Sequence, residues 1–300
     1  MTSSSERAEA MPSASLRDRI EAAGTRLLLG LFRLLPIDLA SAIGGRLTRL
    51  VGPHLRAQKI ALRNIARALP ELSAAEHRQA LDAMWDNLGR TVAEYPHLRQ
   101  MMALGRVEVI GMEHLDAAVA RGKPVLFFSG HIGNWEVASL PNVQLGLPLA
   151  QVYRAANNPL VDEMLLELRR SLGLLPIPKG ASGARRIFAH MRQGGSLALL
   201  VDQKMNDGIA VPFFGREAMT APAAADLALR FDASLIPVRV ERVDGGARFR
   251  VTVFAPVPLA PTGNRLADTK RLMTEVNAIL ESWIREKPGS WFWVHRRWPD

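Results

Sequence analysis

The chain of 300 residues contains no cysteine, so it forms neither disulfide bonds nor thiolate metal sites, as is typical of a reducing compartment. It also lacks the HExxH pair of zinc hydrolases and the GxSxG turn of serine hydrolases. These absences exclude several common hydrolase classes, so other residues must carry any chemistry.

Positive charge is concentrated in the N-terminal part of the chain. The formal net charge is +9, and residues 1–67 carry eleven Lys/Arg against five Asp/Glu, a difference of +6. Such an excess indicates an anionic partner. Because there is neither a nucleic-acid-binding module nor a set of aromatic residues interleaved with the basic ones, we expect no nucleic acid.

A membrane surface is the better candidate for that partner. Residues 16–37 are rich in Leu and Phe and are interrupted by Arg26 and Arg33. The uncharged stretch between these arginines is far too short to cross about 30 Å of hydrocarbon. Basic and apolar residues mixed on one helix indicate a segment that lies in the headgroup plane. A helix packed in the core, or an uncleaved signal-like segment, is the alternative.

The hydrophobic pattern divides the chain into three regions. Residues 1–15 are predicted to be disordered, residues 16–100 to be helical and membrane-associating, and residues 101–300 to form an α/β domain. We expect helices over 16–35, 39–51, 54–69, 74–94, 113–121, 134–145, 159–172, 183–193, 220–231 and 265–286. We expect strands over 106–110, 124–129, 149–153, 197–201, 235–241 and 248–254. This alternation predicts a mostly parallel sheet flanked by helices, behind a helical membrane-facing N-terminal region.

The segment after the second expected strand is the best candidate for chemistry. His131 follows the apolar run 125–128, and Glu136 comes five positions later. A histidine can take a proton from a hydroxyl, and a carboxylate can hold its ring in one tautomer. The two side chains meet only if His131 lies on a turn before the helix, which Gly130 and Gly133 would permit. A solvated or structural pair is the alternative, and one His-Glu pair offers too few ligands for zinc.

Polar residues at other strand ends could join this site. Arg154 ends the expected strand 149–153, and its guanidinium could bind phosphate or stabilise an oxyanion. Arg169 and Lys179 could extend the positive surface, or simply be solvated. Asp202 and Gln203 follow the strand 197–201 and would approach the rim of the crevice.

The C-terminus is rich in tryptophan. Four of the six tryptophans lie in the last 18 residues. Tryptophan suits both core edges and membrane interfaces, so packing against the core and lipid contact are both open.

Several blocks, taken in order, resemble a known family. The block from His131 to Glu136 resembles the H-x4-D/E motif of glycerolipid and lysophospholipid acyltransferases. With Tyr153-Arg154-Ala-Ala-Asn157-Asn158-Pro159, Asp202-Gln203-Lys204, Val211-Pro-Phe-Phe-Gly215 and Trp291-Phe-Trp-Val-His-Arg-Arg-Trp298, it is similar to the late acyltransferases of lipid A biosynthesis, the lauroyl/myristoyl transferases. The similarity extends from about residue 25 to the C-terminus.

The resemblance implies O-acyl transfer from acyl carrier protein to a hydroxyl of a Kdo-bearing lipid A precursor, at the cytoplasmic face of the inner membrane. It implies His131 as general base, Glu136 as its orienting partner, and Arg154 near the substrate. Attack by the acceptor hydroxyl itself requires neither a cofactor nor an enzyme nucleophile. The implied partners are the carrier-protein thioester, an anionic glycolipid and the membrane surface. Acylation of a lysophospholipid, an ornithine lipid or a glycosylated phosphoinositide remains open, as does an idle lipid-binding protein of the same fold.

Overall fold

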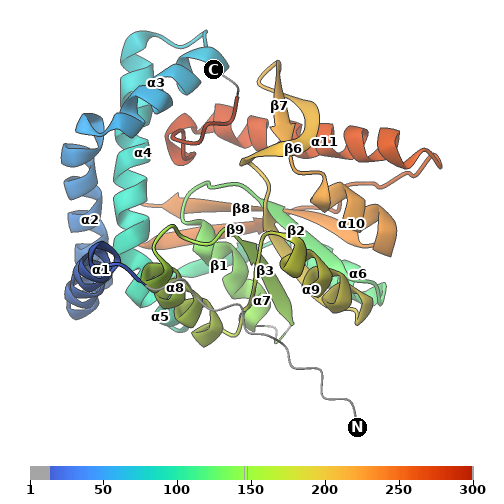
Figure 1. Ribbon diagram of the computed structural model, residues 1–300, viewed down its shortest axis with the longest axis horizontal. Helices are drawn as coiled ribbons and strands as arrows, with labels where there is room; N and C mark the ends of the chain where they lie inside the picture. The colour runs from blue at the N-terminus through green and yellow to red at the C-terminus, as the bar shows by residue number, and fades with distance from the viewer. Residues whose placement is uncertain (1–13, 145, 147, 299–300) are drawn as a thin grey trace.

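The computed structural model describes residues 14–144, 146 and 148–298 (Figure 1). The segment 1–15, expected to be disordered, lies outside the described residues except for its last two positions. At its end, the Ser15 hydroxyl accepts a hydrogen bond from the Asp18 backbone N–H and caps the first helix, α1 (Leu16–Leu34).

The N-terminal region is helical, as predicted. α1 is followed by α2 (Ile37–Val51), η1 (Gly52–His54), α3 (Arg56–Ala68), α4 (Ala74–Glu94), η2 (Tyr95–His97) and α5 (Leu98–Ala103). The expected capping box of α4 is present, because Ser73 and Glu76 exchange side-chain to backbone hydrogen bonds. The four long helices form one side of the molecule in Figure 1, with α2 lying alongside α4.

The α/β domain is built on a seven-stranded sheet. Its strands, in the order β1-β9-β8-β2-β5-β3-β4, are Val107–Ile110, Arg248–Val253, Ser234–Val243, Val125–Ser129, Ser196–Leu200, Leu149–Tyr153 and Leu175–Pro178. All neighbouring pairs are parallel except β8 and β9. The mostly parallel α/β fold is therefore confirmed. The edge strand β4 and the separate hairpin β6 (Lys204–Phe213) and β7 (Arg216–Thr220) were not expected.

Helices cover both faces of this sheet. On one face, α9 (Ala181–Arg192), α10 (Ala223–Phe231) and α11 (Arg265–Glu286) share a core with Leu126 and Phe128. On the other, α5, α6 (Met112–Ala120) and α8 (Pro159–Ser171) pack against the side of the sheet that holds Phe127. The single helix expected over 134–145 is instead η3 (Trp135–Ser139) followed by the short α7 (Leu140–Gln144).

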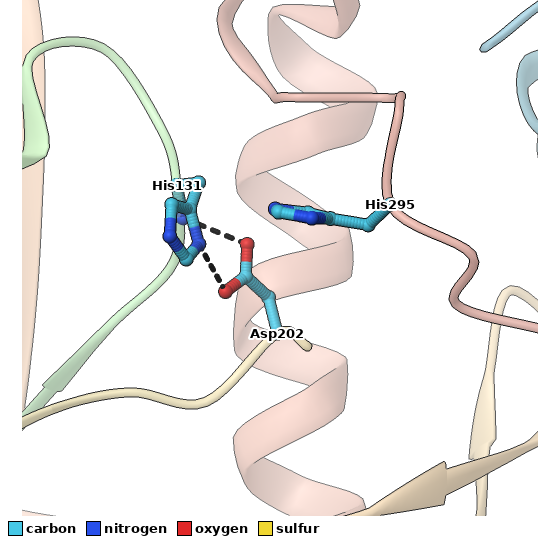
Figure 2. Close-up of side chains that lie close together, drawn as sticks. All are labelled: His131, Asp202 and His295. Carbon is cyan, nitrogen blue, oxygen red and sulfur yellow. Dashed lines mark hydrogen bonds and ion pairs between the residues drawn. The ribbon is translucent and has the colours of Figure 1, made fainter. Parts of the chain in front are cut away.

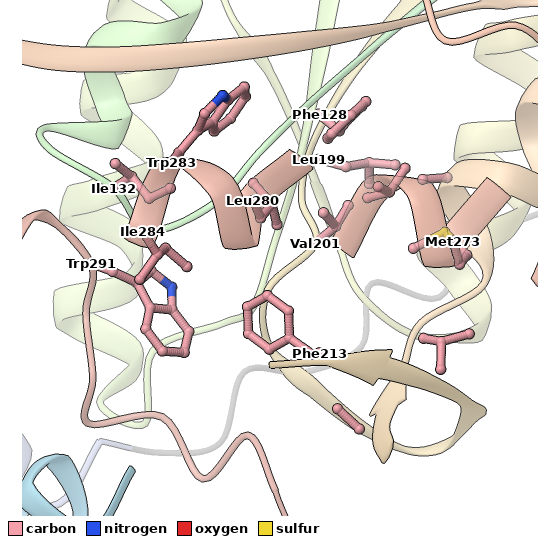
Figure 3. Close-up of a cluster of buried hydrophobic side chains, with 14 of the residues drawn as sticks. Phe128, Ile132, Leu199, Val201, Phe213, Met273, Leu280, Trp283, Ile284 and Trp291 are labelled. Atoms are coloured by element: carbon pink, nitrogen blue, oxygen red, sulfur yellow. The ribbon is translucent and has the colours of Figure 1, made fainter. Parts of the chain in front are cut away.

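The C-terminal tryptophans belong to the first of these cores. Figure 3 shows Trp283 and Trp291 among the apolar side chains of α11, the sheet and the hairpin. Trp293 and Trp298 are buried as well, and Trp298 stacks on Phe213 at 5.6 Å between ring centroids. Of the two alternatives for this segment, packing against the core is confirmed.

The N-terminal helices keep many large apolar side chains exposed. In α1, Leu16, Ile20, Leu27, Leu31 and Leu34 are exposed and lie within an arc of about 60° on the helix surface. Exposed leucines continue along α2. Within residues 14–144, 146 and 148–298, no helix combines the length and apolar character needed to cross a bilayer.

Candidate active site

The turn after β2 places His131 at the carboxyl end of the sheet. Ile132 pairs with Trp291 as an isolated bridge, and the Gly133 N–H donates to the Ser290 carbonyl at 3.0 Å. Gly133 has a φ of 59°, and a Cβ added there would lie 2.5 Å from the Val240 carbonyl oxygen. Only glycine fits this position without movement of the backbone. The turn expected before Glu136 is therefore present.

Asp202 is the carboxylate that holds the His131 ring. Its Oδ1 lies 2.8 Å from His131 Nδ1, and its Oδ2 accepts from the His131 backbone N–H at 2.7 Å (Figure 2). Trp291 Nε1 donates to the same Oδ2 at 2.8 Å. Because an ionised carboxylate can only accept, Nδ1 carries the proton of a neutral ring and Nε2 keeps the lone pair.

The charge state of Asp202 follows from these contacts. Its side chain is fully buried, which alone would raise the pKa of the carboxyl. Electrostatic attraction and hydrogen bonds from His131 outweigh that burial and hold the pKa well below its ordinary value. Asp202 is therefore an anion fixed against the imidazole.

Glu136 takes part in a different network. Its Oε1 accepts from Arg169 Nη2 at 2.6 Å and from the Tyr95 hydroxyl at 2.9 Å, and its Oε2 accepts from Arg169 Nε at 3.3 Å. Glu136 is 1% exposed. The expected contact with His131 is thus replaced by an ion pair with α8, because both carboxylate oxygens accept from Arg169. Arg169, expected to bind substrate or solvent, is committed to this pair.

Asn134 anchors the same turn to the N-terminal helices. It occupies the N-cap position of η3, but its side chain forms no capping hydrogen bond. Its Nδ2 instead donates to Glu94 Oε2 at 2.8 Å. Glu94 is fully buried, and it also accepts from the Ser41 hydroxyl and the Arg242 guanidinium. α2, α4 and β8 therefore hold the turn through one buried carboxylate.

His295 completes the cluster around Asp202. Figure 2 shows its ring reaching the His131–Asp202 pair from the C-terminal segment, 4.7 Å from the His131 ring between centroids. Burial, together with the proximity of His131, lowers the pKa of His295 to about 3. Its Nε2 is buried and, among the described residues, has no hydrogen-bond partner. His295 is therefore a neutral ring at physiological pH.

His131, Asp202 and His295 each offer one ligand atom within 4.8 Å of the others, which is close enough to hold a metal ion. The hydrogen bonds of Asp202 to His131 and Trp291 account for the same arrangement, because both carboxylate oxygens already accept. The hydrogen bonds of Asp202 thus explain why these three candidate ligands lie close together.

The remaining candidates lie at the edge of the site. Lys179 Nζ is 3.4 Å from Gln203 Oε1, and Lys179 and Arg154 are both exposed. Because the strand of Arg154 is the next one expected after β2, sequence order predicts that the two strands lie side by side. This is wrong, because β5 lies between β2 and β3. Asp202, which follows β5, therefore reaches His131, whereas Arg154 lies farther out near Lys179.

A large cavity adjoins the turn without reaching the imidazole. It measures about 950 Å³ and lies between α4, the end of β8 and residues 286–290. Ile132 and Gly133 contribute to its wall, and His131 does not. This cavity therefore borders the backbone of the turn that positions His131.

Comparison with known proteins identifies the family. The sequence profile of the bacterial lipid A biosynthesis acyltransferases matches residues 17–300. The chain is 23% identical over 277 residues to the lipid A biosynthesis acyltransferase of Haemophilus influenzae, covering 89% of this chain and 85% of that protein.

Of two further relatives, one is also named for lipid A and the other for a phosphatidylinositol mannoside. The lipid A biosynthesis lauroyltransferase of Escherichia coli is 26% identical over 256 residues, covering 81% of this chain and 79% of that protein. The phosphatidylinositol mannoside acyltransferase of Mycobacterium tuberculosis is 26% identical over 248 residues, covering 79% of this chain and 75% of that protein. The chain belongs to the bacterial lipid A biosynthesis acyltransferase family, whose members named here acylate lipid A or a related glycolipid.

Proposed function

We propose that this chain transfers a fatty acyl group from the thioester of an acyl carrier protein to a hydroxyl of a Kdo-bearing lipid A precursor. Family membership supports the reaction class. The observation that carries the mechanism is the 2.8 Å contact between His131 Nδ1 and a fully buried Asp202 at the carboxyl end of β2. A base held in one tautomer by an anion is what activation of an acceptor hydroxyl requires.

In the proposed reaction, His131 Nε2 takes the proton of the acceptor hydroxyl as its oxygen attacks the thioester carbonyl carbon. The new C–O bond gives a tetrahedral intermediate, which then expels the thiolate. The thiolate receives the proton from the imidazolium, so the base is restored and no covalent enzyme intermediate forms. Asp202 stabilises the transient imidazolium. His295, which stays neutral, adds no competing positive charge beside it.

The exposed cations at the edge of the site are proposed to bind the polar part of a substrate. Arg154 and Lys179 are exposed and adjacent, and Gln203 accepts from Lys179 at 3.4 Å. Phosphate groups on a lipid A precursor would complement two neighbouring cations. In this assignment Glu136 and Arg169 act only by fixing η3 against α8.

We further propose that α1 and α2 lie on the cytoplasmic face of the inner membrane. The exposed apolar arc of α1 is bordered by Arg26 and Arg33, which are exposed as well. An apolar stripe bordered on one side by cations suits the headgroup region of an anionic bilayer. Attachment at this surface would bring the site to a glycolipid acceptor.

This attachment is tested by reversing charge without changing the apolar arc. Arg26→Glu/Arg33→Glu should at least halve the fraction bound to vesicles that contain anionic phospholipid. The matched control, Arg78→Glu/Lys270→Glu, makes the same charge change at two exposed positions elsewhere and should bind as the wild type does. If both variants sediment with vesicles like the wild type, the electrostatic part of the attachment is refuted.

A glycosylated phosphoinositide is the second candidate acceptor. The mycobacterial relative named for such a lipid is as similar, at 26% identity, as the lauroyltransferase. Nothing in the His131–Asp202 pair distinguishes the two acceptors, because either one offers a hydroxyl. The His131–Asp202 pair argues against a lipid-binding protein without catalytic activity. Burial of an anion beside a histidine lowers the stability of the fold, and such arrangements cluster at functional sites.

Mass spectrometry of lipids from a strain with and without the gene tests the acceptor. Loss of one acyl chain from lipid A supports the proposal, and the mass difference gives the chain length. Loss confined to a phosphoinositide glycolipid supports the second candidate and overturns the first. No change in either lipid, together with no transfer by the purified protein, refutes both.

A further inference from the structure

A segment beside the active site contains several basic residues and no acidic residue. Residues 168–201 contain six Lys/Arg and no Asp or Glu. Two of the six, Arg169 and Arg170 in α8, form ion pairs. The four that remain are exposed and lie on α9 or directly before it: Lys179, Arg185, Arg186 and Arg192. In the part of the chain that the structure describes, none of these four forms an ion pair.

The three arginines share one side of α9. At 100° per residue, Arg185, Arg186 and Arg192 fall within an arc of about 120°. The opposite side packs into the core through Ile187 and Met191. The basic face of α9, which we define as these three arginines, therefore points away from the core.

The N-terminal end of α9 lies at the edge of the active site. Lys179 lies two residues before α9, beside Gln203 and close to Asp202. From there the 12 residues of α9 extend over about 18 Å. A partner lying along the helix would therefore have one end at the edge of the active site.

A membrane does not suit this face. No large apolar side chain of α9 is exposed, whereas α1 exposes a whole stripe of them. The two helices also belong to opposite sides of the sheet. α1 is tied to α8 by a hydrogen bond from Asn158 Nδ2 to the Asp18 carbonyl at 2.9 Å, and α8 and α9 pack on different cores. A partner at α9 would approach from the side away from α1.

We propose that the basic face of α9 docks the protein that carries the acyl donor, a small acidic protein holding the acyl chain as a thioester on a flexible arm. The inference rests on the proposed function, which requires a thioester donor at His131. Exposed arginines that form no ion pair within the described residues complement an acidic surface and accelerate its encounter. The arm would then enter past Lys179.

The test compares two donors on the same variants. Arg185→Glu/Arg186→Glu should raise the KM for the acylated carrier protein at least tenfold and leave kcat unchanged, because docking precedes the chemistry. Transfer from an acyl-pantetheine thioester, which lacks the protein, should stay within twofold of wild type. Raising the salt concentration should increase the carrier-protein KM of the wild type far more than that of the variant. Arg78→Glu/Lys270→Glu is the control of equal charge change.

The outcomes separate this inference from the function on which it rests. If the wild type transfers from neither donor, the proposed function fails. If the wild type uses the carrier protein and Arg185→Glu/Arg186→Glu uses it equally well, only the docking face is refuted. Equal loss with both donors would show a damaged site, and lost vesicle binding would show a membrane surface. Either of these results overturns the proposal as well.

Discussion

Asp202→Asn gives the sharpest test of the catalytic assignment. The carboxylate accepts three hydrogen bonds, two on Oδ2 from the His131 N–H and Trp291 Nε1 and one on Oδ1 from His131 Nδ1. An asparagine can keep the first two through its carbonyl oxygen. Its amide then faces Nδ1 as a donor, which forces the neutral imidazole to carry its proton on Nε2. The lone pair needed to take the hydroxyl proton is then on the wrong nitrogen.

The size of the effect follows from the same geometry. Loss of the correct tautomer and of the anion beside the imidazolium costs on the order of 10⁴ in rate in a comparable hydrogen-bonded triad. We therefore expect kcat to fall by about 10³–10⁴, which is about 4–5 kcal/mol of transition-state stabilisation. KM should change little, because Asp202 is fully buried and does not reach the substrate.

The assay is transfer of labelled acyl chains to the glycolipid acceptor, with thermal melting as the check on folding. Asp207→Asn is the matched control, since it makes the same chemical change at an exposed carboxylate five residues later. A folded Asp202→Asn variant with kcat within about threefold of the wild type would refute the reasoning. Equal losses in both variants would also remove Asp202 from the mechanism.

Two further predictions concern the neighbours of this pair. Glu136→Gln leaves the mostly buried Arg169 guanidinium without its anion, so we expect a loss of about 3 kcal/mol in unfolding free energy. In the folded fraction, kcat should fall less than tenfold. An unchanged melting temperature with kcat as low as in Asp202→Asn would contradict this. Burial lowers the pKa of His295 to about 3, below its unfolded value, so the unfolded state binds the extra proton and stability falls with pH below about 6.5. Urea unfolding between about pH 6 and 4 should show His295→Asn losing less stability than the wild type, by up to about 1.4 kcal/mol per pH unit, and equal slopes would refute the assignment.

The elements that the sequence predicts well are those with a local signal. α4 begins at Ser73 with a capping box, and an apolar period of 3.6 runs through it, so both its start and its length are readable. β2 is a short apolar run that ends at Ser129 before glycine. In such segments the residues that decide the structure are neighbours in sequence.

The elements that were missed have weak or contrary local signals. β4 is Leu175-Pro-Ile-Pro178, and proline is tolerated there because β4 is an edge strand. The first half of β6 contains Asn206, Asp207 and Gly208, which are turn formers, and its pairing with β7 shifts register between Lys204 and Ile209. Tertiary contacts with α11 stabilise this hairpin, and no local pattern shows them.

The two carboxylates of the site show the same limit in chemical terms. Glu136 is close to His131 in sequence, and a motif that pairs them suggests a direct contact. The structure uses that proximity differently, because Glu136 fixes η3 to Arg169, 33 residues away, while the carboxylate on the imidazole comes from Asp202, 71 residues away. Strand order creates this arrangement, since β5 inserts beside β2 and delivers Asp202 to the turn. The spacing of a motif can therefore mark the residue that holds η3 in place, while the partner of the base comes from a strand that lies next to β2 in the sheet.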